Sequence, residues 1–117
     1  MADPTPESLC QSKCLPCEGG VPKLDRDAAT EFLNATPQWT LSESALMISR
    51  KVALGNFVQA MDLMNKIAEV AESEGHHPEL HLTSYRNLRI DLTTHAIGGL
   101  SENDFIVAAK IDQLFSE

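Results

Sequence analysis

The stretch NFVQAMDLMNKIAEVAESEGHHPEL, residues 56–80, contains the clearest structural signal in the chain. Its apolar side chains recur every three or four residues, which predicts an amphipathic helix over residues 56–74. Asn56 can cap the start of this helix, while Gly75 and Pro78 end it. The apolar residues expected to face the core are Phe57, Ala60, Met61, Met64, Ile67, Ala68 and Ala71.

Two strands are predicted after this helix, LHLTSY at residues 80–85 and NLRIDLTTH at residues 87–95. Alternate side chains of the second strand are apolar, namely Leu88, Ile90 and Leu92. Because neighbouring side chains of a strand point to opposite faces, these three would face the core. His95 is then expected on the other face, at the end of the strand.

The residues before the long helix predict a second helix and a second pair of strands. Residues 24–36, LDRDAATEFLNAT, have the pattern of a short amphipathic helix that ends before Pro37. Residues 38–54 predict two strands joined by a polar turn near residues 42–44. In the second of these strands, one face would carry Leu46, Ile48 and Arg50, and the opposite face would carry Met47, Ser49 and Lys51.

The chain closes with AIGGLSENDFIVAAKIDQLF, residues 96–115, which predicts a turn followed by a helix. Gly98 and Gly99 suit the turn, and Ser101 with Asp104 three residues later forms a capping box with aspartate in place of glutamate. The helix is apolar on more than one side, so it has more surface to bury than one sheet can cover. We infer self-association from this surplus.

The predicted order of elements is helix, two strands, helix, two strands, helix. Since hairpins supply the strand pairs, we expect an α+β fold: a four-stranded antiparallel sheet with three helices packed on one face. This domain would occupy residues 24–117. It is preceded by a cysteine-containing arm, residues 1–23, which is expected to be extended or coiled because it holds four of the six prolines and no sustained periodicity.

The arm contains all three cysteines of the chain, Cys10, Cys14 and Cys17. An odd number of cysteines so close together is a poor disulfide framework, which favours reduced thiols. A zinc site is the alternative, but it needs a fourth ligand from elsewhere or from another chain.

The composition of the 117 residues limits the classes of partner. The formal net charge of −8 argues against nucleic acid, because phosphate binding needs concentrated Lys and Arg. No apolar run reaches the length of a membrane span. The first residues, MADPTPES, lack the basic and apolar segments of a secretory signal, so a cytoplasmic location is expected. A neutral small molecule is compatible with this charge.

Three histidines are the candidates for proton transfer: His76, His77 and His95. Histidine titrates near neutral pH, but exposed or structural histidines are the alternative from the residues alone. Adjacent residues in an extended segment point in opposite directions, so His76 and His77 share a site only if Gly75 and Pro78 turn the chain there. No metal ion is expected, because HHP does not match a helical zinc motif.

The sequence alone leaves the roles of Asp104 and His81 undecided. Asp104 can accept backbone N–H groups at the start of its helix, or it can orient an imidazole or bind a ligand N–H beside His95. The spacing does not choose between these roles. His81 is expected to be a strand residue, and its function is undecided.

Taken together, these segments resemble the pterin-4a-carbinolamine dehydratases, a family known in animals also as dimerization cofactors of a homeodomain transcription factor. The resemblance rests on QWTL, EGHHPEL, Tyr85, LTTHAIGGLSENDF and AAKID in this order, and it spans residue 24 to the C-terminus. The segments SKCLPCEGGVP and HLTSYRN resemble a longer branch of the family found in plants and some protists.

The resemblance implies loss of water from 4a-hydroxytetrahydropterin to give quinonoid dihydropterin, which recycles the pterin of aromatic amino acid hydroxylases. It implies no metal or organic cofactor and a homotetramer, a dimer of dimers. The catalytic residues carried over are His76, His77 and His95, and those expected to bind substrate are Trp39, Pro78, Thr94 and Asp104. Within this set we expect acid–base work from His76 and His95, and orientation of the pterin by His77.

Three departures and one alternative accompany the resemblance. The stretch from His77 to Tyr85 is one residue longer than in the animal relatives. Leu80 stands where many relatives have an aromatic residue, and Asn103 replaces a basic residue often found before the aspartate. The alternative function is a protein-binding module that stabilises a partner's oligomer, as a transcriptional cofactor or an assembly chaperone.

Overall fold

The computed structural model of the chain describes residues 5–14 and 21–115. Its elements in chain order are α1 (Pro6–Gln11), α2 (Arg26–Ala35), β1 (Thr40–Leu41), β2 (Ile48–Ala53), α3 (Phe57–Glu74), β3 (Glu79–Thr83), β4 (Asn87–Leu92), the 3-10 helix η1 (His95–Ile97) and α4 (Glu102–Gln113). Within these ranges, no helix has both the length and the apolar character needed to span a membrane.

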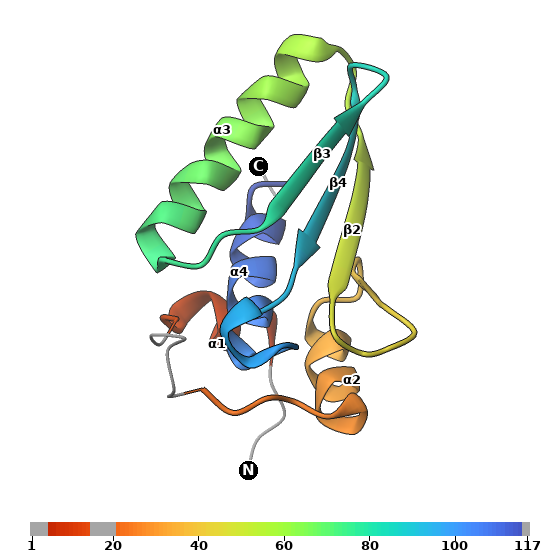
Figure 1. Cartoon of the computed structure of the whole chain (residues 1–117). Coiled ribbons are helices and arrows are strands. Elements are labelled where there is room, and N and C mark those ends of the chain that lie inside the picture. Colours follow the sequence, from red (N-terminus) through yellow and green to blue (C-terminus); the bar gives the residue numbers. More distant parts are fainter. Residues whose placement is uncertain (1–4, 15–20, 116–117) are drawn as a thin grey trace.

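The strands form one antiparallel sheet in the order β1-β2-β4-β3 (Figure 1). β1 pairs with β2 and β3 pairs with β4, so both predicted hairpins are present, and β2 joins them by pairing with β4. The four-stranded antiparallel sheet predicted from the alternating patterns is therefore confirmed.

One face of this sheet carries the core. The buried apolar residues of the strands are Ile48, Leu88, Ile90 and Leu92, which confirms the alternation of apolar residues predicted for β4, and Asp91 is buried as well. Helices α3 and α4 lie on this side of the sheet (Figure 1). α2 packs against α4 through the stacked rings of Phe32 and Phe105, whose centroids are 5.2 Å apart. The predicted α+β fold, with its three long helices packed on one face of the sheet, is confirmed.

Helix α4 lies at the centre of the core. All of its residues from 103 to 109, and Ile111, are buried. The apolar strand residues and the helices α1, α2 and α3 all pack around it. The apolar surplus inferred for this helix was therefore wrong, because three other helices share its burial with the sheet, and self-association stays a prediction.

Helix α3 begins and ends where the sequence predicts. Asn56 caps its start, and Gly75 follows its last residue in the left-handed conformation, with φ of 65°. The buried residues of α3 are Ala60, Leu63, Ile67 and Ala71. Phe57, Met61 and Ala68, which were expected to face the core, are exposed. This helix has apolar side chains on two sides, and periodicity alone did not show which side the sheet would cover.

The N-terminal arm contains a helix where an extended or coiled chain was expected. The Thr5 hydroxyl accepts the N–H of Ser8 at 3.0 Å, and Pro6 suits the first turn of α1. Leu9 is buried in the core cluster beside α4. Six residues are too few to show a helical period, and such a helix depends on tertiary packing for its stability.

The arm also contacts α4 through its cysteines. Neither Cys10 nor Cys14 forms a disulfide among the described residues, and Cys17 lies outside them. The Cys10 thiol donates to the carbonyl oxygen of Ala109 at 3.4 Å, and burial raises its pKa above the ordinary value. The Cys14 thiol donates to the carbonyl oxygen of Asn103 at 3.6 Å.

Glu74, the last residue of α3, links that helix to both α4 and the arm. Its side chain is 2% exposed, and Oε2 accepts a bond from Lys110 Nζ at 2.5 Å. Oε1 accepts the backbone N–H of Cys14 at 2.9 Å. Burial alone would raise the pKa of Glu74, but the bonds from Lys110 and Cys14 outweigh it and hold this pKa below its ordinary value of 4.5.

We expect the Glu74 carboxylate to make stability fall in acid. Because its folded pKa lies below its unfolded pKa, its contribution is complete above about pH 4.5 and is lost as the pH falls from there through the folded pKa. Urea denaturation across this range should show a smaller loss of unfolding free energy in Glu74→Gln than in the wild type. An identical pH dependence in the two proteins would contradict this assignment.

Candidate active site

The side chain of Asp104 is the centre of a buried polar cluster. One oxygen, Oδ2, accepts the backbone N–H of Ser101 at 3.0 Å and the Thr94 hydroxyl at 2.8 Å. The other oxygen, Oδ1, lies 2.6 Å from His76 Nε2. The Thr94 and Ser101 hydroxyls are 2.8 Å apart, and all four residues are buried. The predicted capping box is confirmed, and the same carboxylate also holds an imidazole.

Local backbone features explain why these four residues meet. Gly75 ends α3 in a left-handed conformation, and the N–H of His76 returns to the carbonyl oxygen of Ala71 at 3.2 Å. These bonds close the helix end and send His76 inward toward α4. On the other side, Thr94 forms a bridge with Gly99, which turns the chain from β4 into the start of α4.

His77 lies on the surface next to this cluster. Its Nε2 is 2.7 Å from Glu72 Oε1, and both side chains are largely exposed. His77 and Pro78 line a hollow of about 150 Å³ between α3 and β3, and the other residues of its lining are Ile67, Ala68, Ala71, Glu72 and Leu80. Gly75 and Pro78 thus place His76 and His77 in different surroundings, the first buried and the second exposed.

The sequence predicted His95 at the end of a strand, but in the structure it lies beyond the strand. Pairing of β4 ends at Leu92, opposite Ile48, and His95 begins the 3-10 turn η1 two residues after Thr93 leaves the sheet. Its side chain is exposed, whereas Thr94 just before it is bonded to Asp104. His77 and His95 therefore each adjoin a residue that contacts the Asp104 carboxylate.

Trp39 lies away from the Asp104 cluster. Its indole is 2% exposed, and Nε1 donates to Asp112 Oδ1 at 2.9 Å. Asp112 also pairs with Arg50, yet burial is the larger effect and raises the pKa of this carboxyl. Asp112 is eight residues beyond Asp104 in α4, which at 1.5 Å per residue is about 12 Å along the helix. The binding of the pterin by Trp39 stays a prediction.

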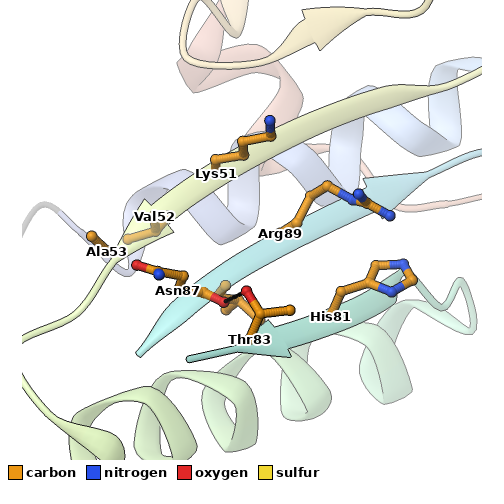
Figure 2. Close-up of a pocket in the computed structure, with 8 residues that line it drawn as sticks. Lys51, Val52, Ala53, His81, Thr83, Asn87 and Arg89 are labelled. Atoms are coloured by element: carbon orange, nitrogen blue, oxygen red, sulfur yellow. Dashed lines mark hydrogen bonds between the residues drawn. The ribbon is translucent and has the colours of Figure 1, made fainter. Parts of the chain in front are cut away.

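The uncovered face of the sheet has a larger hollow, of about 500 Å³. Figure 2 shows side chains from three strands along it, including Lys51, Arg89 and His81, which are cross-strand neighbours. None of the residues predicted to be catalytic or substrate-binding lines it. Because it lacks the titratable groups gathered around Asp104, we do not assign the reaction to it despite its size.

His81, left undecided by the sequence, lies beside this hollow in a cluster with two carboxylates. One ligand-type atom from each of Glu79, His81 and Asp91 falls within 4.8 Å of the others, as in a metal site. Asp91 Oδ1 already accepts the Ser49 hydroxyl at 2.7 Å, and Arg89 Nε lies 3.3 Å from the same carboxylate. The cationic Arg89 offsets the charge that would attract a metal ion.

Sequence reasoning missed Ser101 and Glu72 as neighbours of the candidate catalytic residues. Ser101 was identified only as a helix cap, although its hydroxyl also contacts Thr94. Glu72 stands five residues before His77, one helical turn before the HHP segment. That spacing brings the two side chains together only because the helix ends between them.

Comparison with known proteins gives one consistent family. The family model described as pterin 4 alpha carbinolamine dehydratase matches residues 22–114. A protein of Halorhodospira halophila, provisionally named for this dehydratase, is 45% identical over 107 residues, covering 92% of this chain and 97% of its own. The mitochondrial pterin-4-alpha-carbinolamine dehydratase 2 of Arabidopsis thaliana is 40% identical over 109 residues, covering 91% of this chain and 58% of its own.

Solved structures resemble the fold. A transcriptional coactivator/pterin dehydratase from Brucella melitensis superposes with a TM-score of 0.74 at 28% identity, over 80% of this chain and 98% of that one. A pterin dehydratase-like RuBisCO assembly factor of the alpha-carboxysome superposes with a TM-score of 0.55 at 23% identity, over 66% of this chain and 88% of its own. The second likeness shows the fold alone.

Proposed function

The chain belongs to the pterin 4 alpha carbinolamine dehydratase family, and from this premise we propose that it dehydrates a 4a-hydroxytetrahydropterin to the quinonoid dihydropterin. The product would be reduced again and reused by aromatic amino acid hydroxylases. The observation that carries the proposal is the buried pair of His76 Nε2 and Asp104 Oδ1, 2.6 Å apart. The exposed His77 and His95 each directly follow a residue that is bonded to Asp104.

The reaction needs only proton transfers at two places on the pterin. A proton reaches the 4a-hydroxyl group, the C4a–O bond breaks with release of water, and a ring nitrogen loses a proton, so that no electrons leave or enter the pterin. Positioned imidazoles perform both transfers, each contributing about 10²–10⁴-fold to the rate. Because the reaction transfers only protons and no electrons, it requires no organic cofactor.

We assign the proton transfers to His95 and to the His76–Asp104 pair. The exposed imidazole of His95 can reach a substrate directly. The carboxylate on His76 Nε2 fixes which ring nitrogen holds the proton, as in other histidine–carboxylate pairs. In this proposal Thr94 holds Asp104, and Asp104 positions His76. His77 and Pro78 contact the pterin at the shallow hollow beside α3.

Stopped-flow measurement with chemically generated 4a-hydroxytetrahydropterin tests this function directly. We expect the wild type to accelerate dehydration well above the uncatalysed rate at neutral pH. A rate equal to the uncatalysed one would contradict the proposed activity. It would favour the second candidate, a protein-binding module, a class suggested by the coactivator named in the description of the Brucella relative.

An exposed apolar cluster at the start of α3 favours assembly of several copies. Phe57, Val58 and Met61 lie within five residues, and Val58 is 65% exposed. Apolar groups gathered on one surface usually mark a contact with another protein chain. We propose that this cluster, rather than α4, contributes to a homotetramer.

The prediction for this cluster is a change in oligomeric state. Val58→Glu should dissociate the assembly into smaller species, because a carboxylate would be buried without a partner. Sedimentation velocity measures the change directly. Thr30→Glu adds the same charge at an exposed position of α2 and should leave the assembly intact. An unchanged sedimentation coefficient in Val58→Glu would exclude the cluster as an interface.

A further inference from the structure

The Glu74–Lys110 ion pair puts a buried carboxylate at the C-terminal end of α3, which is energetically unfavourable. A negative charge is unfavourable at the C-terminal end of a helix, where the helix dipole is also negative. The Glu74 side chain is nonetheless only 2% exposed, and Lys110 is 18% exposed. Replacing a buried ion pair with apolar residues of similar size is often neutral or stabilising. Stability alone therefore does not explain why this pair is charged rather than apolar.

The position of the pair suggests another reason. Glu74 stands two residues before His76, and both side chains reach α4: Glu74 to Lys110 and His76 to Asp104. Only Gly75 separates them, and its left-handed backbone allows the chain to change direction. The two links to α4, one on each side of this glycine, restrict the movement of His76 more than its bond to Asp104 alone would.

The arm supplies a third link at the same place. Cys14 donates its backbone N–H to Glu74 and its thiol to the carbonyl oxygen of Asn103, the residue before Asp104. One residue of the arm thus contacts both the segment that carries His76 and the helix turn that carries Asp104. α1 anchors this part of the arm through Leu9, which is buried in the core.

We propose that Glu74 is a positioning residue: together with Lys110 and Cys14 it holds the end of α3 on α4, so that His76 keeps its bond to Asp104. The N-terminal arm is then part of the active-site framework. This inference rests on the proposed dehydratase function for its kinetic consequences, but the position of His76 can be measured without it.

The decisive variant replaces both charged partners with apolar residues, Glu74→Leu with Lys110→Met. It should melt near the wild-type temperature, because no buried charge is left unpaired, although the N–H of Cys14 loses its acceptor. We expect kcat to fall about tenfold or more, since small displacements of reacting groups have effects of this size, with KM changed less. NMR of the histidine rings should show that the signal of the His76 proton shared with Asp104 is weakened or lost.

Two further variants complete the test. Glu74→Gln keeps one acceptor oxygen, which can accept the bond from Lys110 or the one from Cys14 but not both, so its kcat should fall clearly less than in the double variant. Arg50→Met breaks another ion pair to α4, the one with Asp112, and should leave kcat and the His76 signal unchanged. Both keep the proposal testable should the double variant fail to fold.

Three results would overturn the proposal: an intact His76 signal with wild-type kcat in the double variant, a loss in Glu74→Gln as large as in the double variant, or the same loss in Arg50→Met. If the wild type has no dehydratase activity, the proposed function fails. The His76 signal would then still decide the positioning role, because its loss in the double variant supports that role and its persistence contradicts it.

Discussion

Replacing Asp104 with asparagine is expected to lower kcat for pterin dehydration by about 10²–10⁴-fold, the range of a lost acid–base contribution. The same change should lower the free energy of unfolding by about 2–4 kcal/mol, as expected when a fully buried hydrogen-bonded carboxylate is altered. Both effects follow from the number of donors that surround this side chain.

Three donors converge on the two oxygens of Asp104: the Ser101 N–H, the Thr94 hydroxyl and His76 Nε2. A carboxylate accepts at both oxygens, whereas an asparagine amide accepts at one and donates at the other. In either orientation of the amide, an N–H group would face a donor in a buried site. The substitution therefore disturbs either the helix cap or the bond to His76.

Asp25→Asn is the matched control for this substitution. Asp25 caps α2 by accepting the N–H of Ala28 at 2.8 Å, and its side chain is exposed. Asparagine caps a helix about as well as aspartate, so the expected change in stability is within about 0.5 kcal/mol. Thermal melts and stopped-flow rates of both variants give the comparison. Wild-type turnover in a folded Asp104→Asn protein would exclude Asp104 from the catalytic cluster.

The parts of this structure that could be predicted from sequence are those determined by neighbouring residues. The alternation of Leu88, Ile90 and Leu92 decides which face of β4 is buried, and the spacing of Ser101 and Asp104 decides how α4 begins. Both signals lie within a few residues. The sheet and the order of its helices followed from such local patterns.

The parts that could not be predicted depend on contacts between distant segments. The sequence showed three histidines but not that His76 would be buried on Asp104, 28 residues away, while His77 stayed exposed. The environment of Trp39 was decided in the same way by Asp112, 73 residues away. α1 was missed because its stability comes from α4 and not from its own six residues.

His95→Ala is expected to lower kcat by about 10²–10⁴-fold while the protein stays folded. The imidazole of His95 is exposed, so its removal leaves no buried group without a partner, and the unfolding free energy should change by about 0.5 kcal/mol or less. His81→Ala removes an imidazole from the opposite face of the sheet and should retain wild-type turnover. Stopped-flow rates and thermal melts of the two variants separate catalysis from stability.

His76→Ala should reduce turnover as well, but through a different route. His76 is buried, so its removal takes a partner from Asp104 and should lower the unfolding free energy by about 1–3 kcal/mol. Added imidazole distinguishes the two histidines: it can diffuse to the exposed position of His95 and restore part of the rate, whereas at the buried position of His76 it must also be oriented by Asp104 and should restore less. Full activity of folded His95→Ala, or equal rescue of both variants, would contradict the division of roles between an exposed proton donor and a buried histidine–carboxylate pair.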